Sequence, residues 1–367
     1  MTSIYIHIPF CSQKCFYCSF SVVVGRGAHA DRYIDCVIKE IEGGRHENIF
    51  SVYWGGGTPS TLNPDQITRL DRSVMQQLNN AGIKEKTIEL NPEDVDKDKA
   101  RLIKDLHFTR VSLGIQSFHE GHLMYLGRGH NHKQALAAFD ILRNAGHDNI
   151  NIDLIYGLPQ QSLEDIKKDL NMIKALSPEH VSLYSLTIDE FSRFYVKKVQ
   201  PLGGDEQISH YVWAIDFLRD LGIEQYEISN FSRLGKESMH NMHYWNGGNY
   251  HGIGMAAHSH TDGRRSWNVA RIKDYMTRIE QGKEATLSFE VLSPEQRLME
   301  RIVFGLRLNR GVDIEQVQEE CGYDIPKERW DQIGEFVAHG FLSYEQPFLK
   351  TTPQGCLILD EISSYLI

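Results

Sequence analysis

The sequence predicts an α/β fold: an open, partial (β/α)6-type parallel barrel followed by a small α-helical, winged-helix-like domain. Two observations carry this prediction. Over roughly the first 230 of the 367 residues, short apolar runs alternate with longer amphipathic segments, the pattern of parallel strands joined by helices. Only six or seven such units fit before residue 230, too few for a closed barrel of eight. A ligand site in such a barrel is expected at the carboxyl ends of its strands.

Six apolar runs are expected to be strands, because each is short and rich in β-branched or aromatic residues. They are residues 3–8, 49–54, 86–90, 109–115, 149–157 and 180–186. Five amphipathic segments are expected to be helices, namely residues 28–44, 63–82, 132–146, 162–176 and 204–222. Asn63 is a suitable N-cap for the second helix, and Gly82 is expected just past its end.

After residue 235 the composition changes, so residues 1–235 are taken as the barrel. Residues 236–290 include a stretch rich in glycine, asparagine, histidine and aromatic residues, and we expect a ligand-binding segment there. Residues 291–367 are expected to form the C-terminal domain, with helices at 293–308, 313–322 and 326–340 and a hairpin-like end at 348–359. Winged-helix domains often bind DNA, but these predicted helices are rich in glutamate, which phosphate groups would repel.

The composition is that of an ordinary globular protein, with 41% hydrophobic residues and a formal net charge of −10. This acidic balance argues against a general nucleic-acid or anionic-membrane surface. The N-terminus lacks the basic and apolar regions of a secretory signal, and no apolar run is long enough to span a bilayer. We therefore predict a cytoplasmic protein. In that reducing compartment Cys36, Cys321 and Cys356 are expected to be packed thiols.

Three further cysteines, Cys11, Cys15 and Cys18, follow the first predicted strand. Thiolates are soft ligands that suit zinc and iron–sulfur clusters. A structural zinc site needs four ligands, and His7 is a candidate for the fourth. A four-iron cluster held by three cysteines instead leaves one iron open to a small molecule. The spacing and the position at a strand end favour the cluster, with zinc and simple packing as alternatives.

The spacing Cys11-x3-Cys15-x2-Cys18 resembles the signature of the radical S-adenosylmethionine (SAM) superfamily. There the open iron of a 4Fe-4S cluster binds the amino and carboxylate groups of SAM, and reduction cleaves its sulfonium to a radical. The stretches YIHIPFC, WGGGTPS, IQSF, DLIYGLP and HNMHYW, in this order, further resemble the oxygen-independent coproporphyrinogen III oxidase family and its haem-chaperone relatives. The resemblance covers nearly the whole chain, including the small C-terminal domain.

This resemblance implies that the three cysteines hold the 4Fe-4S cluster and that residues near the strand ends contact SAM. The implied SAM contacts are Tyr5, Tyr17, Gly56, Gly57, Thr58, Glu89, Gln116, Arg128, Asp153 and Ser185, with His258 as a weak further match. The residue types fit such a ligand. Glycines at a strand end let a polar ligand approach the backbone, and a carboxylate inside an apolar strand is costly unless it is paired. An arginine can pair bidentately with a carboxylate.

Three features favour the haem chaperones over the oxidase. The oxidase has a further cysteine two residues after the triplet, where this chain has Phe20. The oxidase also has a longer segment before its first strand. Finally, the stretch from His240 to Trp245 resembles a motif associated with haem in the chaperones.

The resemblance implies His240 as the haem ligand, with His243 as the second candidate. Aromatic side chains offer flat apolar surface to a porphyrin, and Arg264 and Arg265 can pair with its propionates. We therefore predict a protein that binds haem and delivers it to acceptor proteins, such as those of respiration. The oxidase, and radical methylases or porphyrin-modifying enzymes with the same fold, remain the alternatives. No catalytic residue is assigned, and a monomer or a dimer, with or without peripheral membrane contact, is compatible with the sequence.

Overall fold

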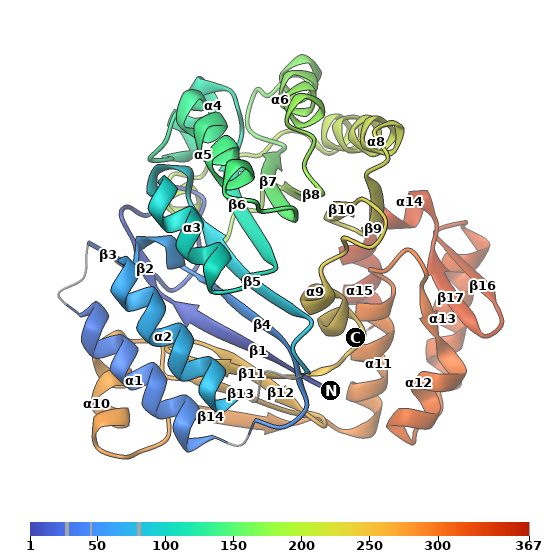
Figure 1. Cartoon of the computed structure of the whole chain (residues 1–367). Helices are drawn as coiled ribbons and strands as arrows, with labels where there is room; N and C mark the ends of the chain where they lie inside the picture. Colours follow the sequence, from blue (N-terminus) through green and yellow to red (C-terminus); the bar gives the residue numbers. More distant parts are fainter. Residues whose placement is uncertain (26–28, 45, 79–81, 367) are drawn as a thin grey trace.

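Six parallel strands form the centre of a curved twelve-stranded sheet in the computed structural model, which describes residues 1–25, 29–44, 46–78 and 82–366 (Figure 1). In sheet order they are β1 (Thr2–Ile8), β4 (Ile49–Gly56), β5 (Glu85–Leu90), β6 (Arg110–Gln116), β7 (Ile150–Tyr156) and β8 (His180–Ser185). Each pairs in parallel with the next. The predicted α/β fold with an open parallel barrel is confirmed.

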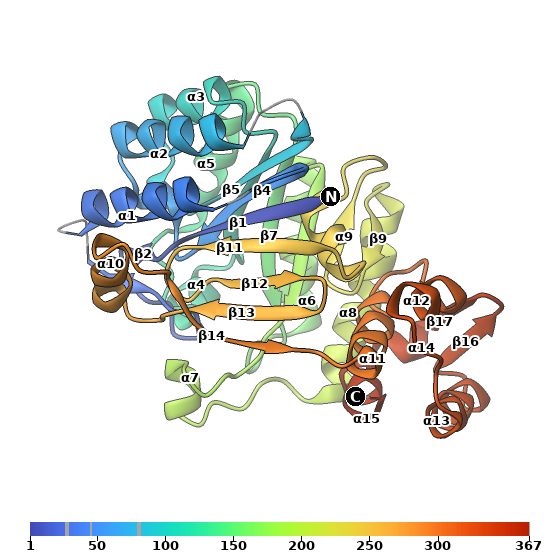
Figure 2. The same ribbon diagram turned by 90° about the horizontal axis from the view of Figure 1, so that it is seen from below.

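Helices connect these strands and cover the outer face of the sheet (Figures 1 and 2). The longer connecting helices are α1 (Ala30–Gly43), α2 (Pro64–Gln77), α3 (Lys97–Asp105), α5 (His132–Asn144), α6 (Leu163–Leu176) and α8 (Gly204–Asp220). Shorter ones are α4 (Glu120–Leu126), α7 (Arg193–Val196) and the 3-10 helices Pro59–Thr61 and Pro92–Asp94. Of these, α3, α4, α7 and both 3-10 helices were not predicted from the sequence.

The predicted start of α2 is confirmed, whereas its predicted end is wrong. Asn63 caps the helix, because its Oδ1 accepts a hydrogen bond from the Gln66 backbone N at 2.9 Å and its own N donates to the Gln66 side chain at 3.0 Å. The helix ends at Gln77, and Leu78 is its C-cap. Gly82 is therefore not the cap, and residues 79–81 lie outside the described residues. So does Ala28 at the predicted start of α1.

Further strands, antiparallel except for β11, extend the sheet at both edges. At one edge β11 (Asn249–Ile253) pairs in parallel with β1, and β12 (His258–Thr261), β13 (Arg264–Asn268) and β14 (Thr286–Val291) follow in antiparallel order. At the other edge β10 (Asn230–Ser232) and β9 (Glu224–Glu227) follow β8. Two further helices belong to this region, α9 (Met239–Trp245) and α10 (Ile272–Glu280). Most of the predicted segment 236–290 therefore continues the barrel sheet.

The C-terminal domain is helical, as predicted. Its helices are α11 (Pro294–Gly305), α12 (Ile314–Cys321), α13 (Lys327–Ala338), α14 (Pro353–Cys356) and α15 (Leu359–Leu366). A small sheet joins β15 (Val312–Asp313), β17 (Phe348–Thr351) and β16 (Leu342–Glu345). The hairpin is therefore formed by residues 342–351. Its predicted place at 348–359 is wrong, because Thr352 caps a helix there with a hydrogen bond from the Gly355 backbone N at 3.1 Å.

Two separate hydrophobic cores reflect this division. The larger core lies between the barrel strands and their helices, and the smaller one lies inside the C-terminal domain. Cys36 and Cys321 are buried and Cys356 is half-buried, and all three are free thiols. None of the helices in the described residues is both long enough and apolar enough to cross a membrane.

Candidate functional site

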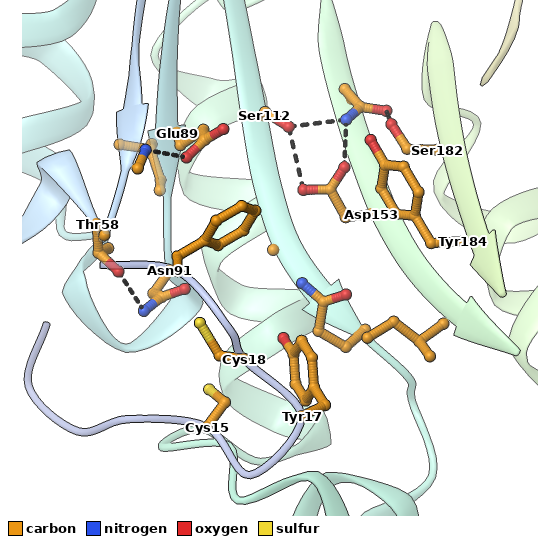
Figure 3. A pocket seen from close by; sticks show the side chains of 18 of the residues that line it. Cys15, Tyr17, Cys18, Thr58, Glu89, Asn91, Ser112, Asp153, Ser182 and Tyr184 are labelled. Carbon is orange, nitrogen blue, oxygen red and sulfur yellow. Dashed lines mark hydrogen bonds between the residues drawn. The ribbon is translucent and has the colours of Figure 1, made fainter. Parts of the chain in front are cut away.

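A cavity of about 460 Å³ runs through the interior of the barrel. One end is closed by the loop that carries the three cysteines, and the walls are formed by side chains of β4, β5, β6, β7 and β8. Figure 3 shows Cys15, Cys18 and Tyr17 on this loop, with Glu89 and Asp153 on the strands beyond it. The cysteine triplet and most of the predicted ligand residues therefore line one common space.

The cysteine loop is fixed by its backbone. The loop lies between two short strands that pair in parallel, β2 (Phe10–Cys11) and β3 (Val23–Val24). The Phe16 N donates to the Leu126 carbonyl at the end of α4, and the Phe16 carbonyl accepts from Phe194 N in α7, both at 2.9 Å. A turn closed by a hydrogen bond from the Cys18 N to the Cys15 carbonyl at 3.3 Å joins the last two cysteines.

Cys11, Cys15 and Cys18 are all free and half-buried. The Sγ of Cys11 lies 3.5 Å from the Thr58 hydroxyl, and Arg128 donates to the Sγ of Cys15 at 3.4 Å. Burial raises the pKa of Cys11 to about 11 and also raises that of Cys18. A metal binds the thiolate form of cysteine. Metal binding by these residues would therefore release protons, and the positive charge of the metal would stabilise the thiolates.

His7 does not complete a zinc site. Its ring is buried and both nitrogens have partners: Nε2 lies 3.1 Å from the Ser21 carbonyl and Nδ1 lies 3.2 Å from the Tyr5 hydroxyl. Within the described residues, no three His, Cys, Asp or Glu side chains lie close enough to share one metal ion. The loop as it stands is therefore not a four-ligand mononuclear site.

The glycines after β4 are required by the packing of the turn. Gly56 has a φ of +109°, and a Cβ there would lie 2.3 Å from the His7 ring. A Cβ on Gly57 would lie 2.6 Å from the Pro9 backbone. These residues let β4 approach the start of the cysteine loop, and Thr58 then reaches both the Cys11 sulfur and the Asn91 amide. Gly56, Gly57 and Thr58 all line the cavity.

Glu89 is a half-buried carboxyl on the wall formed by β5. Its Oε1 accepts from the Tyr53 hydroxyl at 2.7 Å, and its Oε2 accepts from the Gly56 backbone N at 3.2 Å. Burial, reinforced by the charge of Asp153, raises the pKa of Glu89 to about 7. Within the described residues no cation pairs with it, so a positively charged group in the cavity would favour its ionised form.

Asp153 lies deeper in the cavity, on β7. Its carboxylate accepts from Asn151 at 2.7 Å and from Ser112 at 3.2 Å. Burial raises the pKa of Asp153, and these hydrogen bonds partly oppose the shift. The hydrogen bonds orient the carboxylate from its strand neighbours and leave the cavity side of the group for a ligand (Figure 3).

Arg128 connects the strand ends to the cysteine loop. Its Nη2 donates to the Asn91 side chain at 2.7 Å and to the Gly114 carbonyl at 2.5 Å. Its Nε is buried and has no hydrogen-bond partner in the described residues, which is the kind of vacancy that a ligand oxygen fills. Gln116 and Tyr17 line the same part of the cavity.

Two of the predicted SAM contacts lie at the margin of the site. The Tyr5 ring stacks on Tyr53, a wall residue, with ring centroids 6.1 Å apart. Ser185 lines the cavity but is exposed, and it donates to Gln207 at 2.8 Å. The weaker match, His258, lies on β12 beside Trp267. These three predictions have less geometric support than the others.

Several polar wall residues were missed from the sequence. They are Asn91, Ser112, Asn151, Ser182 and Tyr184, which all line the cavity. A usable signal was present, because side chains alternate between the two faces of a strand. Polar residues recur at every second position in otherwise apolar runs, as in Asn151 and Asp153 or Ser182 and Tyr184. This pattern marks the inward face of the barrel.

His240, predicted from the resemblance as the haem ligand, lies inside the protein. It is 2% exposed, and its Nδ1 lies 3.0 Å from the Ser51 hydroxyl. Its ring contacts Tyr53 and Tyr244, with centroids 5.0 and 4.7 Å away, and burial lowers the pKa of the imidazole to about 3. A porphyrin cannot reach this ring in the arrangement described.

The two adjacent arginines of β13 have protein partners. Arg265 forms ion pairs with Glu290 at 3.0 Å and with Glu300 at 2.7 Å. The guanidinium of Arg264 lies 4.2 Å from the centroid of the Phe289 ring. Propionate binding by these arginines would compete with contacts that are already present.

Known proteins resemble this chain along its whole length. The model of the Radical SAM superfamily matches residues 5–173, and the HemN C-terminal domain model matches residues 292–358. The heme chaperone HemW of Lactococcus lactis is 34% identical over 96% of this chain and 94% of its own length. The heme chaperone HemW of Bacillus subtilis is 31% identical over 99% of this chain and 98% of its own length. Among solved structures, coproporphyrinogen III oxidase (HemN) from Escherichia coli superposes with a TM-score of 0.87 at 23% identity, covering 100% of this chain and 89% of its own. That similarity establishes a shared fold.

Proposed function

Because the chain belongs to the HemW family of the radical SAM superfamily, we propose that it is a haem chaperone that carries a 4Fe-4S cluster and SAM. The single observation that carries this proposal is the full-length similarity to HemW proteins. The geometry of the cavity supports the cofactor part, since three free thiols and two half-buried carboxyls with raised pKa values line one space.

In this proposal Cys11, Cys15 and Cys18 hold the cluster, and the cavity wall holds SAM. The Glu89 and Asp153 carboxyls are suited to the ammonium and hydroxyl groups of the cofactor, and Arg128 to its carboxylate. When bound, the two cofactors supply one-electron chemistry at a sulfonium. The protein residues orient the ligand and exclude water from it.

Tyr5, Tyr17, Gly56, Gly57, Thr58, Gln116 and Ser185 complete the proposed SAM site. Haem and haem-accepting proteins are the proposed partners, and the cytoplasm is the proposed compartment. The division into a barrel at 1–235, a haem-binding segment at 236–290 and a C-terminal domain at 291–367 is likewise a proposal.

The second candidate function is that of the oxidase, because the fold is shared with HemN. Phe20 argues against it: the phenyl ring is 65% exposed beside the cysteine loop and lines the cavity, at the place where the oxidase has another cysteine. This chain offers no thiol at that position.

Two anaerobic experiments on the cluster-loaded protein test the proposal. The first is a haem titration followed by absorbance, for which we expect saturable binding at one haem per chain. The second is incubation of the reduced protein with SAM and coproporphyrinogen III, for which we expect no protoporphyrinogen. Product formation would replace the chaperone proposal by the oxidase, and failure to bind haem would remove it. Metal analysis showing zinc without iron would overturn the cluster assignment.

A further inference from the structure

The side chain of Asn91 does not do what its position in the chain suggests. Asn91 is the N-cap residue of the 3-10 helix Pro92–Asp94, and an asparagine at such a position usually accepts a hydrogen bond from the helix backbone. Among the described residues this side chain makes no capping hydrogen bond. It is half-buried and lines the cavity, and its two polar atoms bond instead to Thr58 and Arg128, which each contact a cysteine sulfur.

The amide nitrogen of Asn91 controls the hydroxyl of Thr58. Asn91 Nδ2 donates to Thr58 Oγ1 at 3.2 Å, and Figure 3 shows this pair on the side of the cavity where Cys15 and Cys18 lie. Thr58 is 4% exposed, and its Oγ1 also lies 3.5 Å from the Sγ of Cys11. Because Oγ1 accepts from Asn91, its own proton is left for the sulfur. A thiolate can only accept a hydrogen bond, so this arrangement suits the metal-bound form of Cys11.

The amide oxygen of Asn91 holds the guanidinium of Arg128. Arg128 Nη2 donates to Asn91 Oδ1 at 2.7 Å and to the Gly114 carbonyl at 2.5 Å, and these two bonds fix the plane of the group. In that position Nη1 donates to the Sγ of Cys15 at 3.4 Å. Arg128 therefore brings both a hydrogen bond and a positive charge to this thiol. One asparagine thus positions a donor at each of two cysteines.

Donors at the cysteine sulfurs affect how readily an iron–sulfur cluster is reduced. Reduction adds one electron, and therefore one negative charge, without the transfer of a proton or the breaking of a bond. Hydrogen bonds to the sulfurs stabilise that added charge and are among the factors that set the reduction potential of a cluster. The positive charge of Arg128 acts in the same direction. Both donors that Asn91 positions are therefore expected to raise the potential.

We propose that Asn91 is a positioning residue for the 4Fe-4S cluster. Through Thr58 and Arg128 it holds a hydrogen-bond donor at Cys11 and at Cys15, and it thereby raises the reduction potential of the cluster. The electron itself comes from an external one-electron donor. The inference rests on the proposed function, because it requires the cluster at the three cysteines. It gives Arg128 a role beside that of a cofactor contact, and it explains why the Asn91 side chain is diverted from the helix that it begins.

The test is an anaerobic redox titration of the cluster-loaded, SAM-free protein with dithionite, in which electron paramagnetic resonance follows the reduced cluster. Thr58→Val keeps the shape of the side chain and removes the hydroxyl. We expect it to lower the equilibrium constant for one-electron reduction about tenfold, which corresponds to about 59 mV. Thr58→Ser keeps the hydroxyl and should restore most of this loss. Asn91→Leu should lower the potential at least as much as Thr58→Val, because it releases both donors.

A double variant and a distant variant complete the test. Because Asn91 and Thr58 act in one network, Thr58→Val should lower the potential less in the Asn91→Leu background than in the wild type. Asn63→Ala is the matched control. Asn63 is exposed and bonds to Gln66 at the start of α2, so its loss should cost some stability and leave the potential unchanged.

Wild-type potentials in both Asn91→Leu and Thr58→Val would overturn the inference. So would a Thr58→Ser protein no closer to the wild type than Thr58→Val, or an equal shift in Asn63→Ala. If Asn91→Leu assembled no cluster, the comparison of Thr58→Val with Thr58→Ser would decide. Iron and sulfide analysis of the wild type tests the cofactor assignment separately. A wild type without a cluster would contradict the proposed function itself, whereas a loaded wild type with insensitive variants would contradict only the role of Asn91.

Discussion

Glu89 and Asp153 are two carboxyl groups in one cavity, and neither has a cationic partner among the described residues. Protein interiors rarely retain such groups without compensation, because burying an unpaired charge is expensive. Here the cost is visible as raised pKa values for both groups, caused first by burial. Carboxyl groups that stay unpaired in the ligand-free protein are typical of a binding site, where the ligand supplies the missing positive charge.

The first prediction concerns the pH dependence of SAM binding. The apo Glu89 has a pKa of about 7, so below that value it is mostly neutral and must lose a proton to pair with the ligand ammonium. SAM affinity should therefore rise with pH, by up to about tenfold per unit, and level off above about pH 7. Glu89→Gln should bind more weakly and without this dependence. Isothermal titration calorimetry across the range measures both effects.

Glu190→Gln is the control for that experiment, since Glu190 is an exposed carboxylate near the cavity mouth. It should leave both the affinity and its pH profile unchanged. A flat profile for the wild-type protein would remove Glu89 from the binding of the ammonium group. The raised pKa of Glu89 also affects the stability of the ligand-free protein. The native state holds the Glu89 proton more tightly than the unfolded chain does. The stability that this proton contributes is therefore lost as the pH rises through about 7.

At the scale of elements, the end of β6 shows how a distant helix fixes a residue that lines the cavity. Gln116 has a φ of +73°, which a non-glycine residue adopts only when its surroundings hold it there. The two following residues are held by Asp169 of α6, which accepts from the Ser117 hydroxyl at 2.8 Å and from the Phe118 backbone N at 2.7 Å. The stretch IQSF is thus positioned by a helix about 50 residues further along the chain.

We predict that Asp169→Ala lowers the free energy of unfolding by about 2–3 kcal/mol, because it leaves a buried hydroxyl and a buried backbone N–H without an acceptor. Asp169→Asn should restore most of the loss, since its carbonyl oxygen can still accept one of the two bonds. Urea denaturation of the apo protein measures both. Equal stability of the alanine variant and the wild type would show that water replaces the carboxylate. Asn171→Ala, at an exposed position of the same helix, provides the comparison.

Helix α9 depends on a buried carboxylate at its start. Glu85, at the beginning of β5, accepts from the backbone N of Met239 and of His240, both at 3.0 Å, and from Arg110 at 3.2 Å. A carboxylate at a helix N-terminus satisfies free N–H groups and suits the helix dipole. The same group balances a buried guanidinium, so one side chain of the sheet determines where α9 begins.

Glu85→Gln should therefore lower the free energy of unfolding by about 3–5 kcal/mol, because Arg110 loses its buried counter-charge. Combining it with Arg110→Met should recover part of that loss, since both charges are then absent. Thermal or chemical denaturation of the wild type, the two single variants and the double variant gives the free energies of unfolding for a double-mutant cycle. Additive losses would mean that the two side chains act independently.

The elements that the sequence predicted well are those with strong periodicity. The six parallel strands are short runs rich in β-branched and other apolar residues, and the long helices have clear apolar faces and, in α2, a recognisable cap. Strands β11 to β14 were not predicted, because residues 238–268 are rich in glycine and polar residues and lack a clear two-residue alternation. Their pairing depends on contacts far apart in the sequence, such as Tyr250 of β11 beside Ser3 of β1. Local propensity does not contain that information.

The same distinction applies to the candidate site. Cysteine spacing and polar residues near strand ends were visible in the sequence, and the cavity brings most of them together. The burial of His240 was not visible, because it follows from Ser51, Tyr53 and Tyr244, which approach it only in the folded chain. A motif identifies which residues belong together, whereas the fold decides which of them a ligand can reach.

At the scale of the whole molecule, the ion pair between Arg307 and Glu227 is one of several contacts between the barrel and the C-terminal domain. Arg307, which follows α11, lies 3.7 Å from the carboxylate of the fully buried Glu227 on β9. Its guanidinium also lies 4.4 Å from the centre of the Trp245 ring, at the end of α9. Two backbone hydrogen bonds accompany this contact, from Ile228 N to the Arg307 carbonyl at 3.2 Å and from Asn309 N to the Tyr226 carbonyl at 3.1 Å. The C-terminal domain therefore contacts the helix that carries His243.

The contribution of the Arg307–Glu227 ion pair to stability can be measured through its dependence on pH. Burial raises the pKa of Glu227, and Arg307 lowers it again, so removing the arginine raises the pKa further and leaves an unpaired buried carboxylate at neutral pH. Arg307→Ala should lower stability by about 2–4 kcal/mol near pH 8 and by less near pH 5, where Glu227 is protonated in the variant. In a Glu227→Gln background the pH dependence of the loss should disappear. Lys327→Ala, on an exposed position of α13, is the control. A loss of equal size at both pH values would mean that Arg307 joins the two domains through its contact with Trp245 and not through charge.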